Sequence, residues 1–468
     1  MKSIFKFILF TLAFSLTFSC FKDNDDSAIQ SSEINDFVWK GMNFVYLYKD
    51  RISNLANDRF TSDSDYRNFL NGFDSPENLF ESLIHERALV DRFSWITSNY
   101  IELEQQFSGV TKTSGAEFNF YYAPGSTTSV FGVVRLVQPS SSASSTSLTR
   151  GQIFNKIDGT SLTENNLRSL LTPETYTVHL AAYDTNGTAA PEDDSITDST
   201  ETITLTKTVF SENPIFITDV ITLNTMKVGY LMYNGFVANY DAELNAVFGD
   251  FKAQNIEHLI LDLRYNPGGS VSTAAALGSM ITGLSNEVFA RLQYNSDLES
   301  YNTNYDFTST LSDDTPINSV GLSKVYLITT NGSASASEMV INSLKPYIDV
   351  VQIGTNTNGK AQASITIYDS PDFQRQGANP NHLYALQPLV AATVNKDNLG
   401  VPFNGLTPDI EVRENVTNFG VLGDVNEPLL AAALAAIQSG RFASDVQGIT
   451  PIMDSNSFKP HSKDMYLD

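Results

Sequence analysis

Cysteine is almost absent from this sequence, because Cys20 is the only one in 468 residues. A single thiol cannot form an intrachain disulfide. With only five histidines besides, the chain also lacks the ligands of a zinc ribbon or finger. Basic residues are few as well: 29 Lys and Arg stand against 53 Asp and Glu, for a net charge of −24. That charge repels phosphate backbones and anionic lipid surfaces, which argues against nucleic-acid binding and against membrane adhesion through basic patches.

The composition is that of a globular protein with several domains. At about 150 residues per domain, the length indicates roughly three domains. Hydrophobic residues make up 41% of the chain, which is enough to form sizeable cores, and the charged fraction of 18% leaves no long stretch that looks disordered by charge alone. Collagen, coiled-coil and polytopic membrane proteins are excluded.

The first nineteen residues have the pattern of a signal peptide. Lys2 and Lys6 precede a nearly apolar stretch, 7–18, which is too short to span a bilayer comfortably. Ser19-Cys20 resembles a bacterial lipobox, although Thr17 stands where leucine is usual. This predicts cleavage before Cys20 and lipidation of its thiol, hence a cell-envelope lipoprotein on the periplasmic face or outer-membrane surface of a Gram-negative bacterium. Ordinary signal cleavage with an idle cysteine is the alternative.

Changes in periodicity divide the rest of the chain into five segments. Residues 20–30 are an acidic tether, which resembles the surface-export signal of Bacteroidetes lipoproteins or is a plain spacer. The other segments are a helical domain, a β-rich domain, a domain of alternating strands and helices, and a tail of weak periodicity that we expect to be loosely ordered: 31–108, 109–208, 209–440 and 441–468. Within the helical domain, Trp39 and Trp95 are expected in the core, with an aromatic ligand cage as the alternative.

The β-rich segment resembles a PDZ domain of the bacterial protease type. Its strands are followed by an Ile157-Asp158-Gly159 turn and by a short helix over 162–171. Such domains bind extended C-terminal peptides by strand addition beside a helix. A small β domain without a ligand is the alternative.

Two turns of small residues lie at strand-to-helix junctions in the α/β segment. Asn266-Pro267-Gly268-Gly269 follows a buried strand over 258–263, and the glycines allow close backbone approach to a ligand. Ser333 to Glu338 follows a second buried strand, 324–329, and opens a helix over 335–344. A serine at this turn lies at the positive end of the helix.

A nucleophilic serine needs a base, and no histidine lies in either turn. The sequence also has no G-x-S-x-G elbow. A lysine can serve if burial keeps its amine neutral, and Lys360 follows a third strand, 350–354. Each feature also has a plain structural interpretation. Ser335 and Glu338 match a capping box, Lys360 could be a solvated loop lysine, and the glycines could form a tight turn.

Taken together in order, these motifs resemble the S41 family of serine peptidases, the C-terminal processing or tail-specific proteases. The spacing also agrees, since Ser335 and Lys360 are 25 residues apart. The N-terminal helical segment and 384–410 look like the Bacteroidetes lipoprotein branch of this family. The resemblance implies an α/β fold, with a ClpP/crotonase-like core beside a PDZ-like domain and an N-terminal helical domain.

The same resemblance implies roles for individual residues. Ser335 would be the nucleophile and Lys360 the general base, and an oxyanion hole would be formed by the backbone N–H of Ala336 with that of Gly268 or Gly269. No metal or cofactor is implied. The partners would be polypeptide substrates and, through Cys20, the membrane.

One position departs from the family pattern. Many relatives carry a glutamine four residues after the lysine, where this chain has Ser364. Gln362 would share a strand face with Lys360 and could orient it instead. Two other functions stay open: a catalytically degenerate lipoprotein that binds peptides without turnover, and a structural or nutrient-uptake surface component.

Overall fold

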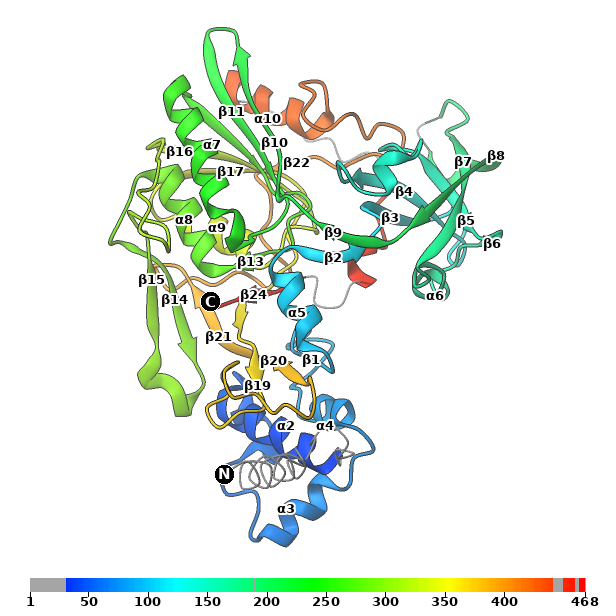
Figure 1. The fold of residues 1–468 in the computed structure, drawn as a ribbon. Coiled ribbons are helices and arrows are strands. Elements are labelled where there is room, and N and C mark those ends of the chain that lie inside the picture. Colours follow the sequence, from blue (N-terminus) through cyan, green and yellow to red (C-terminus); the bar gives the residue numbers. More distant parts are fainter. Residues whose placement is uncertain (1–30, 189, 441–448, 459–462, 468) are drawn as a thin grey trace, which may run out of the picture.

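The computed structural model describes residues 31–188, 190–440, 449–458 and 463–467. The predicted signal peptide, the acidic tether and the lipidation site Cys20 lie outside the described residues. Three bodies are visible in Figure 1: N-terminal helices, a β-rich domain and an α/β core, with helix α5 (Tyr100–Phe107) running between them. Within the described residues, no helix is long and apolar enough to cross a membrane.

The α/β core is a six-stranded sheet that is parallel except at one edge. In spatial order its strands are β10 (Ile215–Leu223), β11 (Met226–Tyr233), β12 (His258–Asp262), β16 (Lys324–Thr329), β17 (Asp349–Gly354) and β22 (Ile410–Glu411). Strand β10 is the antiparallel one. The predicted strands 258–263, 324–329 and 350–354 are therefore present, neighbouring and parallel, as the alternation of strands and helices indicated.

Alternating side chains of this sheet form two separate cores. Leu231, Leu261 and Leu327 pack against three helices on one face, α7 (Asp241–Gln254), α8 (Val271–Thr282) and α9 (Ala336–Leu344). Tyr230, Ile260 and Tyr326 face the other side, where they pack against α10 (Pro428–Ser439). Because strands buried on both faces need no polar side, they appear as continuous apolar runs in the sequence.

A second six-stranded sheet lies beside the α/β core. Its order is β13 (Gly269–Ser270), β24 (Met465–Tyr466), β18 (Gln362–Ser364), β21 (Leu389–Val394), β14 (Val288–Tyr294) and β15 (Thr303–Asp306). The two residues of β24 come from the predicted tail, although their neighbours in the sheet, β13 and β18, lie at the end of the glycine turn and just after Lys360.

The β-rich domain is one sheet with a short helix, α6 (Leu167–Leu171). Its strand order is β23 (Met453–Asp454), β3 (Ala116–Tyr122), β4 (Val130–Val137), β5 (Ile153–Ile157), β7 (Thr175–Asp184) and β8 (Ser195–Thr206), and β6 (Thr160–Ser161) pairs with β5. The connection to the α/β core is a two-stranded ribbon of β2 (Val110–Thr113) and β9 (Thr208–Ser211). The acidic stretch 191–198 forms a short 3-10 turn and the exposed start of β8.

The N-terminal helices rest on the second sheet. Helices α2 (Ser31–Val45), α3 (Asp63–Leu70) and α4 (Pro76–Ser82) share an apolar core with residues of β14, β20 (Ala385–Gln387) and β21. Ser75 caps α4, and Pro76 begins it, as its sequence predicts. Strand β1 (Trp95–Thr97) then pairs with β20, which in turn pairs with β19 (Ile367–Tyr368). The 85–95 loop thereby comes beside the α/β core.

The tail differs from its prediction, since its described parts belong to two sheets. Met453–Asp454 pairs with β3 of the β-rich domain, and Met465–Tyr466 pairs with β13 and β18. The weak periodicity has a physical reason. Each piece is only two residues long and depends on partners more than 100 residues away, so a local pattern cannot specify it.

Buried ion pairs join the core to the β-rich domain. Arg264 is fully buried and donates to both carboxylate oxygens of Asp262 and of Glu427. Arg150, from the β-rich domain, donates to Glu414 at 2.7 Å and to the Tyr265 hydroxyl at 2.7 Å. Arg264 therefore pairs with nearby acids directly before the glycine turn.

Replacing Arg264 by methionine should destabilise the core strongly. The change keeps the volume but leaves Asp262 and Glu427 buried without their cation, which typically costs about 3–5 kcal/mol. Urea unfolding followed by circular dichroism would measure the loss. The control is Arg413→Met, which removes a part-exposed pair with Glu411 and should change the unfolding free energy by less than about 1 kcal/mol. Similar losses for both variants would contradict the role given to Arg264.

Candidate active site

Ser335 is the residue just before α9 and has a strained backbone. Its φ is 64° and its ψ is −117°, a conformation that a residue with a side chain rarely adopts. The side chain is fully buried, and its hydroxyl oxygen has no hydrogen-bond partner within the described residues. The predicted helix start is therefore correct to within one residue. Ser335 and Glu338 stand as a capping box, and the Ser335 N–H donates to Glu338, but the serine hydroxyl oxygen itself has no partner within the described residues.

The Glu338 carboxylate joins the serine turn to the lysine turn. One of its oxygens accepts hydrogen bonds from the backbone N–H of both Ser335 and Lys360, each at 2.9 Å. The other accepts from the N–H of Gly359 at 2.7 Å and from the hydroxyl of Thr357. Glu338 is fully buried, and this burial raises its pKa, while the four hydrogen bonds act to lower it. The serine turn and the lysine turn are thus bound to the same side chain.

Lys360 lies in a closed environment. Its side chain is fully buried, and the Nζ atom donates to the Lys463 carbonyl at 2.6 Å and to Asp464 Oδ1 at 3.1 Å. The Nζ atom also lies 5.1 Å from the centre of the Phe93 ring. Burial lowers the pKa of Lys360, and the carboxylates of Asp464, Asp91 and Glu338 partly oppose that shift. The direction is the one a general base requires.

The glycine turn packs directly on the serine. A Cβ added at Gly268 would come within 2.5 Å of the Ser335 Cβ, so only glycine fits there. The Gly268 N–H, however, donates to Asn266 Oδ1 at 3.0 Å. Of the two glycines predicted for the oxyanion hole, Gly268 therefore has its N–H engaged elsewhere. Gly269 pairs with Met465 of β24, and Ala336 is the first residue of α9, where N–H groups have no acceptor within the helix.

Gln362 does not contact the lysine amine in the way its strand position suggested. Within the described residues, the partners of Lys360 Nζ come from residues 463 and 464, and the Gln362 side chain lies by the Tyr48 hydroxyl instead. Ser364, at the position where relatives carry glutamine, donates from Oγ to the Met465 carbonyl at 2.9 Å. Ser364 thus contacts the segment next to the lysine, and neither residue is a hydrogen-bond partner of the lysine amine.

Three contributors to the site were missed from the sequence, and all come from distant parts of the chain. Trp95, expected in the core, donates from Nε1 to Asp464 Oδ2 at 3.0 Å. Arg92 donates to the Gly359 carbonyl at 3.1 Å, which holds the lysine turn from the outside. Asp464 contacts both the lysine and the tryptophan. None has a local motif that would have indicated its role.

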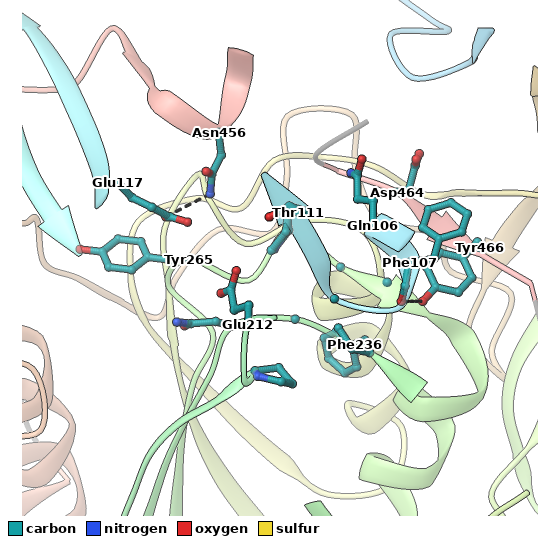
Figure 2. A pocket seen from close by; sticks show the side chains of 18 of the residues that line it. Gln106, Phe107, Thr111, Glu117, Glu212, Phe236, Tyr265, Asn456, Asp464 and Tyr466 are labelled. Atoms are coloured by element: carbon teal, nitrogen blue, oxygen red, sulfur yellow. Dashed lines mark hydrogen bonds between the residues drawn. The ribbon is translucent and has the colours of Figure 1, made fainter. Parts of the chain in front are cut away.

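A pocket lies beside the glycine turn, and Pro267, Gly268 and Gly269 line it. Figure 2 shows Phe107 and Tyr466 lying together at one side of it, with Glu117, Glu212 and Asn456 at the other. Asn234 also lines it, is 7% exposed, and has neither side-chain polar atom paired within the described residues. An amide with a spare donor and a spare acceptor is suited to a peptide backbone. In the part of the chain that is described, no cluster of His, Cys, Asp and Glu could hold a metal ion.

Changing Glu338 to glutamine should disorder both turns at once. The amide NH₂ would face backbone N–H donors where an oxygen now accepts, and hydrogen bonds to a charged group are worth about 1.5–3 kcal/mol. We expect a loss of at least about 2 kcal/mol in unfolding free energy and slower labelling of Ser335 by a fluorophosphonate probe. Glu243→Gln, on the exposed face of α7, is the matched control. A stable, normally labelled Glu338 variant would refute the joining role.

Two family models match the chain. One, described as peptidase family S41, matches residues 227–412, and the other, the peptidase S41 N-terminal domain, matches residues 33–95. The first range holds the serine, lysine and glycine turns. The second holds the N-terminal helices.

Curated relatives match over shorter stretches. A probable CtpA-like serine protease of Staphylococcus epidermidis is 32% identical over 139 residues, which is 30% of this chain and 26% of that protein. A carboxyl-terminal-processing protease of a Picosynechococcus species is 24% identical over 220 residues, which is 43% of this chain and 49% of that protein. The chain thus spans about a quarter to a half of the length of these relatives.

Solved structures match over most of the chain. A Bacteroides fragilis protein assigned to the S41 proteases has a TM-score of 0.67 at 27% identity, covering 86% of this chain and 97% of that one. The photosystem II D1 C-terminal processing protease shares the fold, with a TM-score of 0.50 at 17% identity and coverage of 87% and 98%. The predicted α/β fold class is thereby confirmed, and the chain belongs to peptidase family S41.

Proposed function

We propose that this protein is a serine endopeptidase that cuts extended polypeptides with a Ser335–Lys360 dyad. The observation that carries the proposal is the single Glu338 oxygen that accepts from the N–H of both residues, which fixes the two turns against each other. The strained, unpaired serine and the buried lysine support it. A serine used only for capping would have its hydroxyl paired, and a solvated lysine would be exposed.

The proposed reaction follows from these positions. Neutral Lys360 takes the Ser335 hydroxyl proton as the oxygen attacks the substrate carbonyl carbon. The negative oxygen of the tetrahedral intermediate is stabilised by the Ala336 N–H at the start of α9, together with the Gly269 N–H. The lysine passes its proton to the leaving amine, and the acyl-enzyme forms. Water, activated by the same lysine, then hydrolyses the acyl bond.

The β-rich domain is proposed to bind the substrate's C-terminal region. Its strand β3 has only the two residues of β23 on its outer side, and the domain also has a helix, α6; a strand and a helix are the elements used in strand addition. The ion pairs from Arg150 to Glu414 fix the domain to the core. We also propose anchoring of the protein to the cell envelope through a lipid on Cys20, from the sequence pattern alone.

Ser335→Ala and Lys360→Met should each abolish cleavage of an unfolded protein such as casein. The protein without residues 1–20 would be assayed with a metal chelator present, and loss of one member of such a dyad typically costs at least about 10³-fold. The matched controls are Ser343→Ala, a buried serine further along α9, and Lys345→Met, an exposed lysine just after that helix. Both controls should retain activity.

Two outcomes would count against the dyad. Equal cleavage by every form would point to another nucleophile or a contaminant. Absence of cleavage by every form, including a wild type shown to be folded, would favour the peptide-binding alternative.

The rate should depend on pH through Lys360. Burial lowers the pKa of this lysine, so the neutral base is formed below the usual titration range of a lysine. We therefore expect kcat/KM to rise with pH through that lowered pKa and then to level off. The rise should be absent from the rate of Ser335 labelling in Lys360→Met. A profile that levels off only in the ordinary range of an exposed lysine would contradict the assignment.

A further inference from the structure

Two described pieces of the predicted tail, 452–458 and 463–467, lie on the surfaces where a substrate would bind. The first pairs with the edge of the β-rich domain, and the second lies between the glycine turn and the strand that follows Lys360. Figure 1 shows β24 in the middle of the molecule, beside β13 and near α5.

The second segment binds as an added strand. Gly269 and Ser270 pair in parallel with Met465 and Tyr466, and Ser364 pairs with Tyr466 from the other side. The Leu467 N–H also donates to the Ser364 carbonyl at 3.1 Å. An extended chain held by backbone pairing on both edges is the binding mode expected of a peptide in a protease cleft.

The same segment contacts Lys360 and packs, beside Ser335, against Gly268. The Asp464 carboxylate and the Lys463 carbonyl both accept hydrogen bonds from the Lys360 amine. The carbonyl oxygen of Asp464 and the Ser335 hydroxyl oxygen both lie 2.9 Å from the point where a Gly268 Cβ would stand. A main-chain carbonyl of this segment and the Ser335 hydroxyl therefore both pack against Gly268.

The side chains of the segment fill sites lined by other parts of the chain. Met465 is completely buried in the main apolar core. Tyr466 stacks on Phe107 of α5, with ring centres 4.2 Å apart and an interplanar angle of 24°, as Figure 2 shows. Trp95 donates a hydrogen bond to the Asp464 oxygen that does not contact Lys360. The cleft thus accepts an acidic residue followed by two large, largely apolar ones.

The first segment lies where a captured peptide would lie on the β-rich domain. Met453 and Asp454 pair antiparallel with Phe120 and Asn119 of β3. Phe458 then packs on the domain core, and the Arg168 guanidinium of α6 lies 5.3 Å from the centre of its ring. Strand and helix are the two elements assigned above to peptide capture.

We propose that residues 452–458 and 463–467 are an intramolecular substrate mimic that holds the peptidase in a closed resting state. The proposal rests on the proposed function, because the surfaces it describes are those of that reaction. While the mimic is bound, the carboxylate of Asp464 holds the lysine amine that the reaction needs as a base, and the backbone edges that a substrate would pair with are taken. A polypeptide that pairs with both β3 and β13 displaces it.

The test uses the chain from residue 21 onward with single substitutions in the mimic. Asp464→Asn keeps the shape and removes the charge that holds Lys360, and Tyr466→Ala removes the stack on Phe107. Each should raise the rate of casein cleavage and of fluorophosphonate labelling by up to about tenfold, the gain expected if the closed state is about 90% populated and the substitution opens it fully. Asp349→Asn, an exposed carboxylate at the far end of β17, is the control and should leave both rates unchanged.

A binding arm separates failure of this proposal from failure of the proposed function. In a Ser335→Ala background, a fluorescent peptide of residues 449–468 should bind Tyr466→Ala at least about tenfold more tightly than it binds the same background with the native tail, by anisotropy. This readout needs no catalysis. It would support the mimic even if no form cleaves casein.

Three results would overturn the proposal. A loss of cleavage in Asp464→Asn with normal folding would make Asp464 a partner in catalysis rather than an inhibitor. Unchanged rates in both variants would show that the segment does not limit access. Equal peptide binding by the native and substituted tails would show that the labelled peptide and the tail do not compete.

Discussion

The site depends on the Glu338 carboxylate, which is buried and accepts four hydrogen bonds from two turns. A buried charge is costly unless it is fully hydrogen-bonded. Here all four donors belong to the serine turn and the lysine turn, the two segments that the carboxylate holds together. Two of those donors are the N–H groups of Ser335 and Lys360, so the cost of burial is offset only when both turns are in place. The position of the dyad and the stability of the core are therefore set by the same four bonds.

Strain at Ser335 is compatible with this arrangement because its neighbours leave little room for another conformation. The φ of Ser335 is positive, and Gly268 packs against its Cβ with no side chain of its own. Asn266 in turn holds the Gly268 N–H. The glycine turn thus has two tasks. Gly268 makes room for the nucleophile, whereas Gly269 presents its backbone to whatever strand enters the cleft.

The sequence predicts those parts of the structure whose causes are local. The apolar runs at 258–263 and 324–329 and the helix that begins after Ser335 are where their patterns place them, since a strand buried on both faces and a helix start have local signatures. Trp95, Arg92 and Asp464 could not be found in this way. Each acts through contacts with residues more than 100 positions away, and its neighbours in sequence carry no sign of those contacts.

The two-part attachment of the tail has a consequence for substrate choice. A two-residue strand pairing is weak by itself. When two such pairings belong to one chain, however, formation of the first keeps the second segment at a high effective concentration near its own site. A peptide that engages only the cleft must therefore compete with a tail that is still held on β3, and it is at a disadvantage. A polypeptide that engages the β-rich domain first removes that advantage, because the tail then keeps only its contacts at β13 and β18. Substrates long enough to reach both surfaces are favoured over short peptides, without any further specificity pocket.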